Sequence, residues 1–401
     1  MSEWKKVKLK DCCHSISDGD HLPPPKSNSG VPFVTIANID ATNHIDFGNT
    51  MFVPLEYYNS LNDILYSVVG SFGKPVLIKE NIPFAFQRHI AILRPNNEIA
   101  DSRFLYYVML TRDFFMQADT VAIGAAQRTI SLTALRNMEV KLPSMETQYR
   151  IASILSRYDS LIENYQKQIK LLEEAAQRLY KEWFVDLHFP GHENAKIVDG
   201  VPEGWEKKTI DDVTCKVTTG LNPRKNFVLG KGSNYYVTIK NMADNTLFLD
   251  DRCDRVDNEA LEKINKRSDL KIGDILFSGI GTIGRVALVD IPTNNWNVSE
   301  SVFTLRANDI VTKEFLYLML LSPDMQNYCQ SNAHGAAQKG IRMADLKAYS
   351  FNLPPFGVIQ KFTNLVTPTI KKVSSIRNQI RLLTEARDRL LPKLMSGEIA
   401  V

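Results

Sequence analysis

The 401-residue sequence has no long apolar run and no cysteine pattern typical of a metal site or a disulfide framework. No stretch approaches the 18 consecutive apolar residues of a membrane-spanning helix, and the lysine-rich residues 1–10 are not followed by the apolar core of a secretory signal. The five cysteines are odd in number and include no Cys-x-x-Cys pair. These absences argue against a membrane or secreted protein, and we expect a cytoplasmic protein with reduced thiols.

Sequence motifs of catalysis are also missing. There is no Gly-x-x-x-x-Gly-Lys-[Ser/Thr] phosphate loop, and no Pro-Asp followed by Glu-x-Lys that would indicate a nuclease. The run Gly279–Gly284 spells Gly-x-Gly-x-x-Gly, but the residues after it read as a strand, whereas a dinucleotide-binding loop opens a helix. We therefore predict a glycine-bent hairpin there. His188 and His192 have metal-like spacing, yet their Phe-Pro-Gly context is more typical of a solvated linker.

Length and charge bound the architecture without fixing a function. A chain of 401 residues is longer than one hydrophobic core usually supports, so two or three domains are expected. The net charge of +3 gives no direct sign of nucleic-acid binding. That small excess comes from residues 354–401, which hold eight Lys and Arg against three Asp and Glu. The rest of the chain is nearly neutral but richly charged, so cations can still gather on one face.

The chain repeats itself at a shift of 211 positions. Gly-Ala-Ala-Gln at Gly124–Gln127 returns at Gly335–Gln338. Asp-Ile-Leu-Tyr-Ser at Asp63–Ser67 returns as Asp-Ile-Leu-Phe-Ser at Asp274–Ser278, and each run is followed by two matched glycines. Self-similarity of this kind indicates two copies of one structural unit.

Each copy divides into a mixed segment and a helical tail. Short β-rich runs broken by Gly, Pro and Asn fill residues 1–143 and 202–354, which we expect to be α+β domains. Residues 144–190 and 355–401 are expected to be long helices, with residues 191–201 as a linker. At the front, Trp4 pairs with Trp205 at a shift of 201, so the second copy carries about ten extra residues. Such insertions are expected in loops.

The two tails carry apolar residues at positions a and d of a heptad. A tail of some 40 residues would be a rod of roughly 60 Å, and two such rods in one chain are expected to pair antiparallel as a coiled coil. A helical hairpin buried in one core is the alternative. Pro368 is expected to kink the second helix or to mark its effective start. The a positions are Leu155, Ile162, Ile169 and Ala176 in the first tail and Ile359, Val366, Val373 and Ile380 in the second.

Cations and amides of the two mixed domains are the candidates for a nucleic-acid interface. Such side chains grip phosphates and read base edges, although ordinary solvated surface is the alternative for any single residue. Lys74 with Arg285, and Arg128 with Lys339, keep a cation at matched places beside glycines, where backbone can approach a phosphate closely. The candidate DNA-binding residues are Lys26, Lys74, Arg88, Gln127, Arg128, Arg224, Lys225, Lys240, Arg285, Gln338 and Lys339.

Both halves show the same order of motifs. Each opens on a tryptophan (Trp4, Trp205), continues with the Asp-Ile-Leu…Gly-x-x-Gly run and ends in Gly-Ala-Ala-Gln…Leu-Pro before a long helix. This layout, over nearly the whole chain, resembles the specificity subunit of bacterial type I restriction-modification enzymes. The resemblance implies an α+β fold with two globular target recognition domains separated by two long antiparallel coiled-coil helices, in a pseudo-twofold internal repeat.

The resemblance also implies a non-catalytic, DNA-binding role. Residues 1–143 and 202–354 would each read one half of a bipartite, asymmetric double-stranded target. The helices would set the gap and dock two methyltransferase subunits, with Tyr165 and Arg377 on their exposed sides. S-adenosylmethionine, ATP and Mg²⁺ are expected in the methyltransferase and restriction subunits, whose complex would methylate adenine and cut DNA. A coiled-coil scaffold that does not bind DNA, or a fragment of a DNA methyltransferase or nuclease, are the alternatives.

Overall fold

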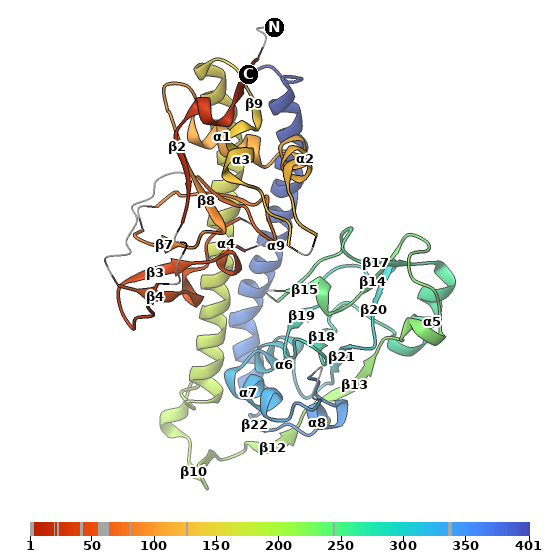
Figure 1. The fold of residues 1–401 in the computed structure, drawn as a ribbon. Helices are drawn as coiled ribbons and strands as arrows, with labels where there is room; N and C mark the ends of the chain where they lie inside the picture. Colours follow the sequence, from red (N-terminus) through yellow and green to blue (C-terminus); the bar gives the residue numbers. More distant parts are fainter. Residues whose placement is uncertain are drawn as a thin grey trace. The chain divides into compact units, whose positions relative to one another are not determined.

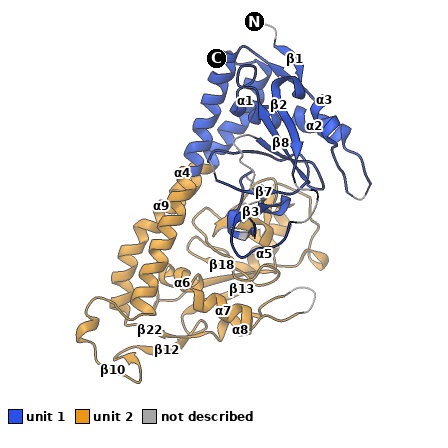
Figure 2. Ribbon diagram, turned by 60° about the vertical axis from the view of Figure 1, so that its left-hand side comes forward, with its two compact units in different colours: residues 1–163, 381–401 blue, residues 164–380 orange. Residues whose placement is uncertain are grey.

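The computed structural model describes residues 4–19, 21, 24–40, 43–54, 64–80, 82–125, 127–243, 245–335 and 339–401. The chain forms two compact units, shown in different colours in Figure 2. The first unit comprises Met1–Glu163 with Arg381–Val401, and the second comprises Asn164–Ile380. Each unit therefore contains part of both long helices, α4 (Met145–Phe184) and α9 (Phe356–Ser396).

The first unit is built on two sheets (Figure 1). A four-stranded antiparallel sheet has the order β2-β8-β5-β6, and a three-stranded sheet has the order β4-β3-β7. In the smaller sheet β3 runs antiparallel to β4 and parallel to β7. A third pairing joins β1 to β9. The elements are β1 (Lys5–Lys8), β2 (Cys13–Asp18), β3 (Val31–Val34), β4 (Met51–Val53), β5 (Ile64–Ser67), β6 (Pro75–Leu77), β7 (Ala85–Phe86), β8 (Ile90–Pro95), α1 (Ser102–Met109), α2 (Arg112–Val121), α3 (Leu132–Asn137) and β9 (Glu139–Leu142).

The second unit repeats both sheets of the first in the same strand order. Its sheets have the orders β13-β21-β18-β19 and β17-β14-β20, with β14 antiparallel to β17 and parallel to β20. Strands β12 and β22 pair as β1 and β9 do. The internal repeat and the α+β class predicted from the sequence are confirmed. The elements are β10 (Ile197–Val198), β11 (Val201–Pro202), β12 (Glu206–Thr209), β13 (Thr214–Thr219), β14 (Asn234–Val237), β15 (Met242–Ala243), β16 (Thr246–Leu247), β17 (Asp254–Val256), α5 (Asn258–Ser268), β18 (Ile275–Ser278), β19 (Val286–Leu288), β20 (Trp296–Val298), β21 (Val302–Ala307), α6 (Lys313–Leu320), α7 (Pro323–Ser331), α8 (Met343–Lys347) and β22 (Ser350–Leu353).

Most of the extra residues of the second copy fall between β17 and β18. The shift between copies is 203 where β4 matches β17 (Met51 and Asp254), and 211 where β5 matches β18 (Ile64 and Ile275). Eight of the added residues therefore enter a stretch that includes helix α5, whose first turn is capped by the side chain of Asp257. The matched residues 55–63 of the first copy lie outside the described residues, so the expectation that the insertion lies in a loop stays a prediction.

The long helices pack into the core of each unit along the predicted heptad seam. Leu155 and Ile162 of α4 are buried, as are Ile359 and Val366 of α9. Other sides are open to solvent, as at the exposed Leu171. The helices are therefore neither free rods nor a hairpin buried on all sides. Helix α9 begins at Phe356, so Pro368 lies within it and does not mark its start.

Two polar contacts and one aromatic contact fix the register of the helix pair. In the second unit, Arg377 of α9 pairs with Glu173 of α4, and the rings of Trp183 and Phe362 lie 5.7 Å apart. Rising numbers on α4 meet falling numbers on α9, so the helices are antiparallel. In the first unit Arg387 of α9 donates to Asp159 of α4 at 2.9 Å.

Candidate nucleic-acid interface

Two loops that lie far apart in sequence meet in each unit. We name them the glycine turn, residues 68–74 between β5 and β6, and the return loop, residues 123–130 before α3. In the second unit the glycine turn is 279–285 and the return loop is 334–341. Both glycine turns join antiparallel strands, so the hairpin predicted at Gly279–Gly284 is confirmed.

The contact between glycine turn and return loop is the same in both copies. The Gly70 amide donates to the Arg128 carbonyl at 2.9 Å, and the Gly281 amide donates to the Lys339 carbonyl at 2.7 Å. Each return loop is closed on itself by paired backbone bonds, between Ile123 and Thr129 and between His334 and Gly340. The repeated sequence motifs therefore build one repeated piece of backbone.

Glycine and serine explain why these motifs recur. Gly70 and Gly281 have φ angles of +68° and +80°, a left-handed backbone that side chains with a Cβ rarely adopt. The buried Ser67 hydroxyl accepts a hydrogen bond from the Lys74 amide at 2.9 Å and donates to the Ser71 carbonyl at 3.0 Å. Ser278 repeats both contacts with Arg285 and Thr282. Each turn is thus held by hydrogen bonds within the turn itself. The turn motifs can therefore recur although other residues of the two domains differ.

Two of the candidate cations are engaged within the protein. In the second unit, Arg285 donates from Nη1 to the carbonyls of Ile239 and Met242, at 2.8 and 2.5 Å. In the first unit, Arg128 pairs with the Asp119 carboxylate. These arginines brace the loops, and whether they also contact DNA stays a prediction.

The other candidates lie at the surface. Gln127 and Lys339 are exposed on the two return loops, and Lys74 is half-buried at the end of its glycine turn. Gln338 lies outside the described residues. Lys26, Arg88, Arg224, Lys225 and Lys240 are all exposed. Of these, Arg224 and Lys225 belong to one 3-10 turn and Lys240 to another.

An aromatic stack beside the first return loop was missed by the sequence reasoning. The rings of Phe72 and Phe115 stack with centroids 5.9 Å apart, and the Arg128 guanidinium lies 5.4 Å from the centroid of Phe72. Ile123, on the same return loop as Arg128, is 69% exposed. The matched residue of Phe72 in the second copy is the buried Ile283. This difference between the halves was the sequence signal that could have indicated the aromatic stack.

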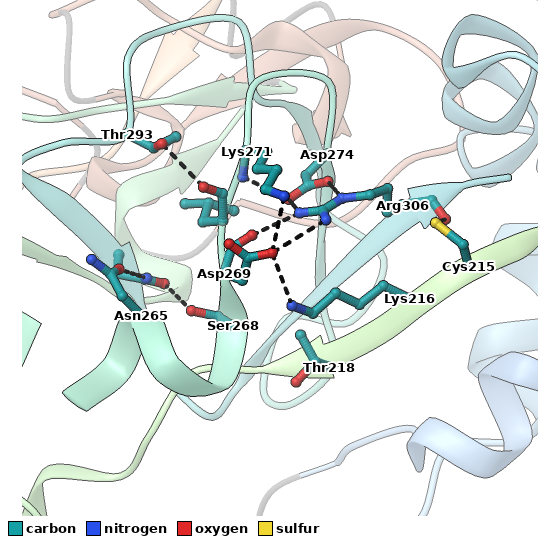
Figure 3. Close-up of polar contacts among 12 residues, drawn as sticks. Cys215, Lys216, Thr218, Asn265, Ser268, Asp269, Lys271, Asp274, Thr293 and Arg306 are labelled. Carbon is teal, nitrogen blue, oxygen red and sulfur yellow. Dashed lines mark hydrogen bonds and ion pairs between the residues drawn. The ribbon is translucent and has the colours of Figure 1, made fainter. Parts of the chain in front are cut away.

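A buried ion pair in the second unit was also missed (Figure 3). Asp274, which is 1% exposed, receives two hydrogen bonds from Arg306, Nε to Oδ1 at 2.7 Å and Nη2 to Oδ2 at 2.9 Å. These bonds raise the pKa of Arg306 above its ordinary value. Asp269 lies beside the pair and is approached by Lys271 at 3.2 Å and Lys216 at 3.6 Å. The hydrogen bond from Lys271 lowers the pKa of Asp269.

The candidate partner-binding residues on the helices are less open than expected. Arg377 has a side chain only 20% exposed and pairs with Glu173 inside the helix pair, so it does not stand on an open side. Tyr165 is half-buried. Their role in partner binding stays a prediction.

Within the described ranges, no group of three or more His, Cys, Asp or Glu is arranged to hold a metal ion. His188 and His192 have ring centroids 5.2 Å apart, and His192 contacts the Phe189 carbonyl at 3.0 Å through Nδ1. Over the same residues, no helix combines the length and the apolar character needed to cross a bilayer.

The internal repeat of the structure matches a known protein family. The family model described as the type I restriction modification DNA specificity domain matches the chain twice, at residues 1–174 and 202–380. The chain belongs to this family. Each match covers one sheet assembly together with part of a long helix, which is the repeat seen in the structure.

Individual relatives agree with the family match. The chain is 28% identical over 305 residues to the type I restriction enzyme MjaIX specificity subunit of Methanocaldococcus jannaschii, covering 75% of this chain and 69% of the relative. It is 24% identical to the HindI specificity subunit of Haemophilus influenzae over the full length of both. A solved S subunit of a type I restriction-modification system from M. genitalium has a similar fold, with a TM-score of 0.60, 18% identity and coverage of 98% of this chain and 96% of that one.

Proposed function

We propose that this chain is the non-catalytic specificity subunit of a type I restriction-modification complex, and that its two units each read one half of a split, asymmetric target in duplex DNA. The observation that carries the proposal is the double family match, one per structural repeat. Two readers that share a framework but differ in their surface residues suit a target with two different halves. Ile123 against His334 is such a difference, since both side chains are exposed.

The repeated contact of glycine turn and return loop supports a common way of holding DNA. Exposed Gln127 and Lys339 stand on loops whose backbone is fixed by the same hydrogen bonds in both units. A cation on a loop held in this way can grip a phosphate, and an amide on the matching loop of the other unit can read an adenine edge. Half-site specificity then comes from the surrounding residues that the two units do not share.

Two exposed leucines support docking of two methyltransferase subunits. Leu171 of α4 is 65% exposed and Leu382 of α9 is 49% exposed, and they stand 211 residues apart at matched positions of the repeat. Large apolar side chains held open at matched positions suit two copies of one partner. In this proposal S-adenosylmethionine, ATP and Mg²⁺ act in the methyltransferase and restriction subunits, and this chain supplies target choice and assembly.

DNA binding is tested with the variant Gln127→Ala/Lys339→Ala in complex with the methyltransferase subunit. We expect weaker binding to duplex DNA and, if Lys339 contacts one phosphate, a salt slope smaller by about 0.9. Lys361→Ala removes another exposed cation, on α9, and should leave both quantities unchanged. Unaltered affinity and slope in the double variant would contradict the assignment of the return loops.

Docking is tested with Leu171→Asp/Leu382→Asp. We expect the isolated subunit to keep its fold, since both side chains already face solvent, while co-purification with the methyltransferase subunit is lost. Each single variant should reduce the stoichiometry from two partner subunits to one. A double variant that still binds two partner subunits would contradict the proposal.

A further inference from the structure

The two sheets of the first unit relate differently to the long helices. The largest apolar cluster of this unit includes Leu155 of α4 and Leu394 of α9, so the α-helical side of the unit is joined to the helices by a shared core. The clusters beneath the β4-β3-β7 sheet contain no residue of α4 or α9 within the described ranges. This smaller sheet packs on the four-stranded sheet. The connection from β3 to β4 and the residues after β6 contact α4 through polar groups.

Glu163 of α4 is the centre of that polar contact. The ring of His44 approaches it, with Nε2 3.1 Å from Oε1, and the Lys79 ammonium pairs with the same oxygen. His44 stands at the tip of a turn closed by the bridge between Ile39 and Ile45, and Lys79 follows β6 closely. One carboxylate on the helix therefore holds two separate segments of the sheet domain.

The second unit has a turn of the same construction in contact with α4. In both units a 3-10 turn with a Thr–Asn capping box leads into a short hairpin whose tip has an asparagine with positive φ, Asn43 at +62° and Asn245 at +53°. Asn245 donates from Nδ2 to Oε1 of Glu173 at 3.3 Å. The contact between hairpin and helix glutamate is thus a shared feature, and among the described residues the hairpin side chain is a histidine in the first unit and an asparagine in the second.

A second contact recurs 211 positions later in the sequence, between side chains of a different kind. Lys79 and Glu163 correspond, at a shift of 211, to Asp290 and Ser374. The Ser374 hydroxyl donates to the Asp290 carboxylate. The place of contact is kept while the ion pair is replaced by a hydrogen bond with a neutral donor.

We propose that Glu163 is a positioning residue that fixes the connection from β3 to β4 on α4 through His44 and the end of β6 through Lys79, and that this contact of the first unit is sensitive to pH and salt. For DNA binding, this contact would set the angle at which the first unit meets its half-site. That consequence rests on the proposed function. The second unit makes the equivalent contacts with Asn245 and Ser374, which do not titrate near neutral pH.

The sign of the pH effect follows from the groups around His44, which are Glu163, Lys79 and Asp40. The hydrogen bond to Glu163 raises the pKa of His44 above 6.5, and the bond from His44, with Lys79 adjacent, lowers the pKa of Glu163 to about 2. The His44 contribution is complete below pH 6.5 and is lost as pH rises through its raised pKa. The Glu163 contribution is present above its ordinary pKa of 4.5 and is lost as pH falls toward 2. The contact is therefore strongest between these ordinary values.

Hydrogen exchange of the full chain, without DNA, tests the contact itself. At pH 6, Glu163→Gln should speed exchange of residues 36–46, corrected for the intrinsic rate, by about two- to fivefold, because partly exposed ion pairs are worth little more. In the wild type, protection of residues 36–46 from exchange should fall between pH 6 and pH 8.5. His44→Gln should remove this pH dependence. Ser374→Ala is the matched control, and it should leave residues 36–46 unchanged at every pH. Equal exchange in wild type and Glu163→Gln, or a pH-independent wild type, overturns the proposal.

A methylation assay on the assembled complex tests the positioning role. Glu163→Gln should lower the preference for the natural gap between half-sites over a gap changed by one base pair, by about two- to fivefold at pH 6 and less at pH 8.5. An unchanged preference, with the expected exchange result, overturns the positioning role. A wild-type complex that binds no split target would instead refute the proposed function, so the two failures are distinguishable.

Discussion

The buried pair of Asp274 and Arg306 gives a sharp prediction for Arg306→Met. Methionine keeps the aliphatic part of the side chain but removes both hydrogen bonds to the carboxylate, and a third bond from Nη2 to the Asp269 carbonyl at 2.7 Å. Asp274 would keep the Lys271 amide at 2.8 Å as a donor. Removing one partner of a buried pair costs about 3–5 kcal/mol, because the remaining charge stays desolvated.

Hydrogen exchange of the full chain measures this loss where it occurs. In the second unit, amides of β18 and β21 should exchange two to four orders of magnitude faster in Arg306→Met, while those of β5 and β8 in the first unit should not change. Asp274→Asn/Arg306→Met should recover about 2 kcal/mol, because the buried charge is gone while the Lys271 contact can remain. The reasoning would be refuted if Arg306→Met lowered the free energy of unfolding by less than about 1 kcal/mol, or if the double variant were less stable than the single one.

Two further predictions concern packing within the units. Gly220→Ala should destabilise the second unit by at least about 2 kcal/mol, since a Cβ would lie 1.6 Å from the Val298 carbonyl oxygen. Thermal unfolding measures the loss, and Gly357→Ala, where a Cβ meets nothing within 4 Å and φ is not positive, is the control. Tyr107→Phe should cost about 1.5–3 kcal/mol in the first unit, since it removes a 2.5 Å hydrogen bond to the carboxylate of Asp159. Because burial, with Asp159 adjacent, raises the pKa of Tyr107, this cost should be constant from pH 6 to 9; a cost that disappears within that range would contradict the assignment of the phenol as donor.

Much of the fold could be predicted from local sequence. The heptad seam identified Leu155 and Ile359 as buried, because helical periodicity alone places them on one face. The hairpin at Gly279–Gly284 followed from glycines beside strand-like residues. The extra residues between β17 and β18 were harder to place, because repeat matching shows that residues were added and not how they fold.

The candidate site was less accessible to sequence reasoning. Arg128 and Arg285 were chosen because they are cations beside glycines, but their guanidinium groups meet Asp119 and the Ile239 carbonyl. Such partners depend on which backbone groups tertiary folding leaves unpaired nearby. The same holds for Asp274, just before β18, and Arg306 of β21, which lie 32 positions apart.

The central claim is that two repeated units read two halves of one split target. Sequencing the methylated adenines in cells that express this chain with its methyltransferase subunit tests it most directly. The account predicts one motif of two different short half-sites separated by a fixed number of unspecified bases, and a chain in which residues 202–354 are exchanged for those of a relative should change one half-site and keep the other. A continuous motif, or a change in both halves, would contradict it.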